Sequence, residues 1–132
     1  MKTRQGLVSN SSTSSFIVVG YKLKYDHRDK NSLLEIVKKL DPTKIDANDT
    51  EAAWDILYEL QNEGREDGLE IFLDGEDGSV YVGIVLADVS SDGDSLENKA
   101  YDIKDLVEKC NIAKKLLDTQ EDPKIYTGTR AC

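Results

Sequence analysis

The sequence has few of the residues that most often carry catalysis or bind metals. It contains one histidine, His27, and two cysteines, Cys110 and Cys132. A single histidine excludes a multi-histidine metal site, and two cysteines far apart in the sequence cannot build a zinc site unaided. A Ser-His-Asp or Cys-His arrangement would have to use His27, which lies in an expected charged turn. We therefore expect no cofactor, no metal and no catalytic residue, and a non-enzymatic protein is favoured over an enzyme.

Long hydrophobic runs and excess positive charge are also missing. The longest apolar run, residues 16–19, is far shorter than the ~20 residues of a membrane-spanning helix. Polar residues follow Lys2 and Arg4, where a signal peptide would carry its apolar segment. Seventeen Lys and Arg against 26 Asp and Glu give a net charge of −9, which repels nucleic acid and anionic lipid. We expect a cytoplasmic protein that is not secreted, carries two free thiols, and binds neither nucleic acid nor a membrane.

The apolar residues that are present recur with the periods of strands and helices. They predict strands over 16–25, 69–74, 80–86 and 124–129, and helices over 32–40, 50–63 and 103–117, with Gly64 as the stop of the second helix. We expect the strand over 69–74 to be half-exposed, because its residues alternate between apolar and polar, and the strand over 80–86 to be buried on both faces. The length of 132 residues suits one domain, so we assign a single domain over 1–132 with a Ser-rich N-terminal segment over 1–15.

The order of these elements is β-α-α-β-β-α-β. If the two early helices form one crossover, this is the βαββαβ order of a ferredoxin-like α+β fold, with a four-stranded, mainly antiparallel sheet and helices on one face. That fold places the first and third strands in the middle of the sheet. The other face of the sheet would then be open, and its apolar residues suggest that a partner protein or a second copy covers it, as a homo-oligomer.

The last helix has the clearest amphipathic pattern in the chain. Asp102 has the position of its N-cap, and apolar residues follow at helical spacing. We expect all of them to face the core: Ile103, Leu106, Val107, Cys110, Ala113 and Leu117.

The acidic stretch over 88–101 is predicted to be a long polar loop. Its carboxylates are weak candidates for a divalent cation, because they lack the register of an EF-hand loop and Asp-Gly pairs also occur in ordinary tight turns. The candidate ligands are Asp88, Asp92, Asp94 and Glu97.

The segment "RQGLVSNSSTSSFIV", residues 4–18, is the most unusual stretch in composition. Its hydroxyl and amide groups could surround an anion such as a nucleotide phosphate, although the glycine-rich backbone and lysine of a P-loop are absent. The candidate ligand-binding residues are Arg4, Ser9, Asn10, Ser11, Ser12 and Thr13. The other interpretation is an ordered loop that leads into a central strand.

This segment resembles an N-terminal signature, R-x-G-F-V-S-N-S-S-S-S-S-F, of many small uncharacterised proteins of phages and bacteria. Leu7 and Thr13 stand where the signature more often has Phe and Ser. The resemblance covers about an eighth of the chain and implies a phage or bacterial origin, hence a bacterial host cell, but no activity.

Taken together, these features predict a small acidic protein, encoded by a phage, that acts by binding a host protein as a modulator or inhibitor, or by self-assembly. One alternative is a small-molecule or nucleotide binding module, or an enzyme, that uses residues 4–15 as an anion cradle. A second alternative is a minor structural or assembly protein of a phage.

Overall fold

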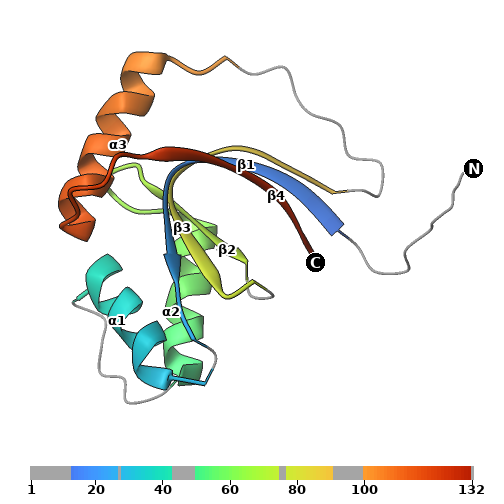
Figure 1. Ribbon diagram of the computed structural model, residues 1–132, viewed down its shortest axis with the longest axis vertical. Helices are drawn as coiled ribbons and strands as arrows, with labels where there is room; N and C mark the ends of the chain where they lie inside the picture. The colour runs from blue at the N-terminus through green and yellow to red at the C-terminus, as the bar shows by residue number, and fades with distance from the viewer. Residues whose placement is uncertain (1–12, 27, 43–49, 75–76, 91–99, 132) are drawn as a thin grey trace, which may run out of the picture.

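The computed structural model describes residues 13–26, 28–42, 50–74, 77–90 and 100–131. Strands and helices follow one another in the predicted order, and they form an α+β fold with one four-stranded sheet and three helices (Figure 1). The elements are β1 (Thr13–Lys24), α1 (Lys30–Leu40), α2 (Thr50–Glu63), β2 (Glu70–Asp74), β3 (Ser79–Ser90), α3 (Ile103–Leu117) and β4 (Lys124–Ala131).

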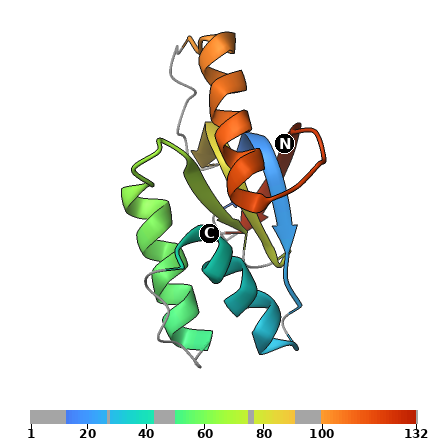
Figure 2. The same ribbon diagram turned by 90° about the vertical axis from the view of Figure 1, so that its left-hand side faces the viewer.

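The sheet has the strand order β2-β3-β1-β4, and each neighbouring pair is antiparallel. The first and third strands are therefore central, as predicted. Figure 2 shows the three helices in front of the sheet, so they cover the same face. β2 and β4 form the two edges of the sheet, and they lie at opposite ends of the strand order.

The sheet bends sharply where two glycines oppose each other, Gly20 on β1 and Gly83 on β3. A Cβ atom on Gly83 would lie 1.9 Å from the carbonyl oxygen of Val19, and one on Gly20 would lie 2.1 Å from that of Val82. Only residues without a side chain allow the two backbones to approach so closely. The bend divides the sheet into a β2 arm, below it in Figure 1, and a β4 arm, which carries residues 13–19, 84–90 and β4.

The main core lies between the helices and the facing side of the sheet. Val37, Leu40, Ala53, Leu57 and Val80 are completely buried there, and the predicted apolar faces of α1 and α2 supply most of the helical contribution. α2 ends at Glu63, and Gly64 follows it with a φ of 75°, which confirms the predicted helix stop.

A second, aromatic cluster packs on the opposite face of the sheet. The ring of Phe16 lies 4.9 Å from that of Phe72 and 5.3 Å from that of Tyr81, between centroids. All three rings are 3–4% exposed. The prediction of a half-exposed strand over 69–74 was wrong for this reason: Phe72 is buried among aromatic rings on the second face, so β2 is buried on both faces from Ile71 to Asp74.

Two element boundaries also differ from the sequence prediction. β3 continues through Asp88 to Ser90, because residues 87–90 pair with the start of β1, so these residues do not belong to a loop. α1 begins at Lys30 and not at Ser32, because the carboxylate of Asp29 accepts the Asn31 N–H and provides the N-cap.

Candidate functional site

Most residues of the proposed anion cradle lie outside the described residues, namely Arg4, Ser9, Asn10, Ser11 and Ser12. Thr13 begins β1, where its backbone pairs with Ala131 of β4, and residues 13–15 are all part of this strand. Residues 13–15 are therefore part of a central strand, whereas residues 4–12, for which the sequence left an anion cradle and an ordered loop open, lie outside the described residues.

The candidate cation ligands are only partly described. Asp88 is exposed on β3, whereas Asp92, Asp94 and Glu97 lie outside the described residues, as do His27 and Cys132. Within the described ranges, no three His, Cys, Asp or Glu side chains gather in a way that could hold a metal ion. Cys110 is a buried free thiol of α3, and burial raises the pKa of this thiol.

The turn between β2 and β3 uses its carboxylates for structure. The hydroxyl of Ser79 donates to Asp77 Oδ2 at 2.6 Å, and Lys22 Nζ of β1 lies 3.1 Å from the same oxygen. These hydrogen bonds, from Ser79 first and then from Lys22, hold the pKa of the Asp77 carboxyl below its ordinary value. Asp77 therefore stabilises the hairpin and its contact with β1, and its carboxylate is not free to bind a metal ion.

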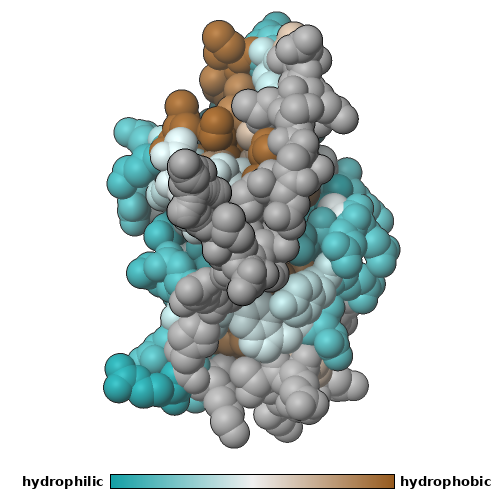
Figure 3. Space-filling view, turned by 90° about the vertical axis from the view of Figure 1, so that its right-hand side faces the viewer, coloured by the Kyte–Doolittle hydropathy of each residue, from teal (hydrophilic) through white to brown (hydrophobic). Residues whose placement is uncertain are grey.

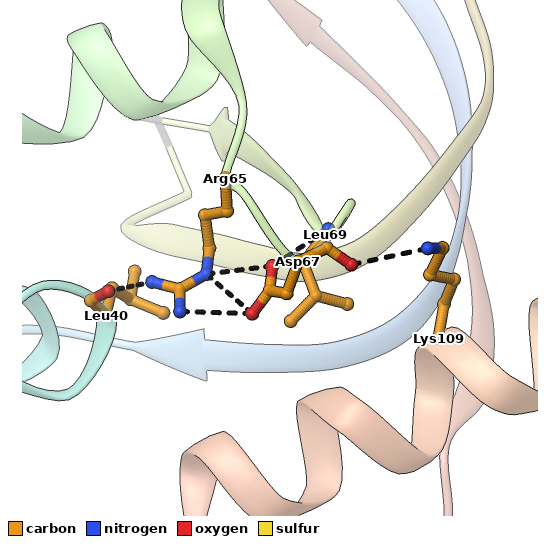
Figure 4. Close-up of polar contacts among 5 residues, drawn as sticks. All are labelled: Leu40, Arg65, Asp67, Leu69 and Lys109. Atoms are coloured by element: carbon orange, nitrogen blue, oxygen red, sulfur yellow. Dashed lines mark hydrogen bonds and ion pairs between the residues drawn. The ribbon is translucent and has the colours of Figure 1, made fainter.

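A polar cluster connects three segments that are distant in the sequence (Figure 4). Arg65, in the connection between α2 and β2, donates from Nη1 to the carbonyl oxygen of Leu40 at the end of α1. Its Nη2 lies 3.1 Å from Asp67 Oδ2. Lys109 of α3 donates to the carbonyl oxygen of Asp67 at 3.3 Å. The cluster thus links the end of α1, the α2–β2 connection and α3.

The carboxylate of Asp67 also accepts the backbone N–H of Leu69, just before β2, at 3.1 Å. Burial acts to raise the pKa of this carboxyl, but the hydrogen bonds from Arg65 and Leu69 outweigh it and hold the pKa below its ordinary value. A surface hollow of about 560 Å³ borders Arg65 and Asp67. Because the guanidinium group is already engaged by protein acceptors, we assign this cluster a structural role.

A second hollow, of about 540 Å³, lies beside the last turns of α3. Lys114 and Lys115 line it together with Glu108, Asn111 and Asp118. Because its positive and negative side chains are interspersed, its charge favours neither an anion nor a cation.

The first half of α3 carries exposed hydrophobic side chains that the amphipathic pattern assigned to the core. Cys110, Ala113 and Leu117 are buried as predicted, but Ile103 is 75% exposed and Val107 is 54% exposed. The prediction was wrong at these two residues because α3 packs on β1 and β3 through its second half, while its first turns extend beyond the sheet (Figure 1).

We call the residues Tyr101, Ile103 and Val107 the α3 surface. All three are exposed, and the Tyr101 hydroxyl donates to the Leu86 carbonyl oxygen of β3 at 3.3 Å. In Figure 3 hydrophobic atoms gather at the upper end of the molecule, the end at which α3 begins in Figure 1. This surface could not be predicted from the sequence, because helical spacing shows which residues share a face but not where the sheet ends.

The face of the sheet opposite the helices differs from the expected open docking surface. Its central rings, Phe16, Phe72 and Tyr81, are already buried in a single chain. Tyr126 of β4 packs against them, with its ring 5.4 Å from that of Tyr81. These rings therefore do not require a partner to remove them from water.

None of the helices in the described part of the chain is both long enough and apolar enough to cross a lipid bilayer. Comparison with known proteins found no matching family model, no matching curated protein and no matching solved structure.

Proposed function

We propose that this protein acts by binding another protein through the α3 surface. The observation that carries the proposal is the exposure of Ile103 and Val107, at 75% and 54%, on a helix that buries Cys110, Ala113 and Leu117 in its second half. Single exposed apolar residues are common, but two that are four positions apart on a helix form a continuous apolar patch. Such a patch is the usual centre of a protein contact, with polar residues around it.

The charges around the patch fit a protein partner better than a nucleic acid or an anionic membrane. The chain carries a net charge of −9, which opposes both polyanions. Next to the patch, Lys104 provides a charged side chain for a polar rim. The proposal includes the more specific form suggested by the N-terminal signature, which is the modulation of a host protein in the cytoplasm of a bacterium.

We also propose that the fold is a variant of the ferredoxin-like arrangement, with two helices in the first crossover in place of one. The central position of β1 and β3 supports this proposal. In this arrangement the helices cover one face of the sheet, and the aromatic cluster lies on the other face.

The experiment is site-specific photo-crosslinking in cells. A photoreactive phenylalanine analogue replaces Val107 in one variant and Asp105 in a matched control, because Asp105 lies on the opposite side of α3. We expect a covalent adduct from position 107 and none from position 105. The partner identified in this way is then tested for binding to the double variant Ile103→Glu and Val107→Glu, which should lose at least about tenfold in affinity.

Two results would contradict the proposal. One is an equal yield of adducts from positions 105 and 107, which would mean that the adducts are nonspecific. The other is an unchanged affinity in the double variant. A covalent adduct with the mass of two chains would identify a second copy as the occupant and replace the proposed partner by self-assembly.

A further inference from the structure

β4 is an edge strand whose outer side has no strand neighbour within the described part of the chain. It pairs only with β1, over residues 124–131, in a continuous antiparallel register. It contains no proline, and no register shift interrupts its pairing with β1. The outer side of such a strand presents N–H and C=O groups at alternate residues, which is a template for another strand.

At the other edge of the sheet, side chains accept hydrogen bonds from the backbone of the edge strand. On β2, the N–H of Leu73 donates to the side-chain oxygen of Gln61 of α2 at 2.8 Å. Just before β2, the N–H of Leu69 donates to Asp67. Among the described residues no side chain accepts a hydrogen bond from the backbone of β4 in a corresponding way.

The side chains of β4 favour an acidic partner. The strand reads KIYTGTRA, with Lys124 at its start, Arg130 near its end and no acidic residue between them. Two of these chains side by side and antiparallel, centred on Thr127, would place Lys124 opposite Arg130 twice, and like charges directly opposite each other destabilise a pair of strands. An acidic strand in the same place would instead pair each cation with a carboxylate.

The strand also offers an apolar contact for an added strand. Ile125 is 68% exposed, although isoleucine is a residue that packs well on a pleated surface. In the register of the sheet it lies beside Val19, which is opposite Ile84 on the next strand. An added strand would extend this apolar row by one residue.

We infer that the outer edge of β4 binds an extended acidic segment of another protein, which adds to the sheet as a fifth strand. Main-chain hydrogen bonds provide the affinity, the cations at the two ends of β4 select acidic side chains, and Ile125 contacts an apolar residue between them. The inference goes beyond the proposed function, because it concerns a different surface and stands even if the α3 surface binds nothing.

The test measures fluorescence anisotropy with two labelled nonapeptides. In one, Val or Thr alternates with Glu; in the other, Lys replaces every Glu. We expect the acidic peptide to bind at least about tenfold more tightly than the basic peptide, and its binding to weaken as salt is raised. Lys124→Glu should reduce its affinity about tenfold, whereas Lys38→Glu, the same charge change at an exposed residue of α1, should leave it unchanged.

A pair of proline variants tests the strand geometry itself. Thr127 and Gly128 are adjacent, so the N–H of one points toward β1 and that of the other points outward. Proline at the inward position removes a bond of the sheet and lowers stability, while proline at the outward position spares the sheet and blocks the added strand. Of these two variants, the one with the higher unfolding midpoint should lose binding of the acidic peptide.

Three results would overturn the inference: equal affinity for the acidic and basic peptides, no binding of either, or undiminished binding of the acidic peptide by the more stable proline variant. The β4 edge would instead bind a second copy if the wild-type protein has the mass of a dimer and binds neither peptide, while the more stable proline variant is a monomer.

Discussion

The two edges of the sheet have opposite properties. β2 is five residues long, is buried from Ile71 to Asp74, and lies beside α2, whose Gln61 accepts a backbone N–H from it. β4 is eight residues long and exposed from Lys124 to Thr129 except at the half-buried Tyr126. Even β3, where it runs beyond the end of β2, has the N–H of Val85 bonded to the Glu70 carboxylate at 2.8 Å.

This difference separates an edge that a helix and side chains cover from an edge that no described residue covers. Side-chain acceptors and a covering helix are common ways to keep a strand edge from pairing with other chains. The β2 edge has both, and β4 has neither within the described residues. The glycine bend separates the two edges, so that β4 belongs to an arm of the sheet outside the main core.

The largest expected effect comes from a substitution at the bend itself. In Gly83→Ala the new Cβ would lie 1.9 Å from the carbonyl oxygen of Val19, a backbone atom that can move only if the two strands separate. We expect a loss of at least about 5 kcal/mol, a large part of the stability of such a domain. Urea unfolding followed by circular dichroism measures it.

The control for this substitution is Gly64→Ala, where φ is 75° but no atom lies within 4 Å of the added carbon. Its cost should be limited to the left-handed backbone, about 1–2 kcal/mol. Similar losses in the two variants would show that the close approach of Gly20 and Gly83 is absent in solution.

The next effect tests the burial of the β2 edge. Phe72 is 3% exposed and contacts the rings of Phe16 and Tyr81. Truncation in Phe72→Ala removes a ring from a packed cluster and should cost about 3–5 kcal/mol in the free energy of unfolding. A loss below about 1 kcal/mol in urea unfolding would mean that this face of β2 is open to water, as its alternating sequence first suggested.

Phe72 also shows how much of this fold the sequence could predict. Alternation and helical spacing predicted all seven elements, and local signals such as Asp102 and Gly64 predicted where α3 begins and α2 ends. The second face of β2 could not be predicted, because its burial depends on Phe16, far away in the sequence. The exposure of Ile103 was missed for the same reason.

The candidate surfaces were harder to predict than the fold. Ile125 and Lys124 belong to a strand that the sequence predicts, but only the strand order shows that this strand is an edge. The link from Arg65 to Leu40 likewise depends on how α1 ends beside the α2–β2 connection. Residue patterns describe a segment and its faces, whereas a binding surface depends on which faces the rest of the chain leaves uncovered.

A smaller effect is expected at Asp67, which accepts the Leu69 N–H beside the β2 edge and pairs with Arg65. Asp67→Asn should cost about 1–3 kcal/mol at neutral pH, because an amide is a poorer acceptor for a guanidinium group. Because the pKa of Asp67 is lowered in the folded protein, the carboxylate stabilises the fold above the unfolded-state pKa of about 3.9, and this contribution is lost as the pH falls through the folded-state pKa.

The difference in unfolding free energy between wild type and Asp67→Asn should therefore shrink as the pH is lowered from 7 to 3 in a series of urea titrations. The exposed Asp55 of α2 provides the control, since Asp55→Asn should show little difference from wild type at either pH. If the difference in unfolding free energy between wild type and Asp67→Asn stays constant down to pH 3, the ionised carboxylate of Asp67 is not the source of that difference.

The smallest effect is expected at the β4 edge, where Ile125 is 68% exposed. Ile125→Thr keeps the branched side chain of a strand residue and removes little buried area, so the free energy of unfolding should change by no more than about 0.5 kcal/mol. In Ile71→Thr, at the buried edge, the same change places a hydroxyl in the core and should cost several times more. Urea unfolding at low and high protein concentration measures both. If Ile125→Thr loses more than about 2 kcal/mol only at high protein concentration, a second copy buries this edge. If it loses as much at every concentration, the chain itself covers β4, and the contrast between the two edges no longer holds.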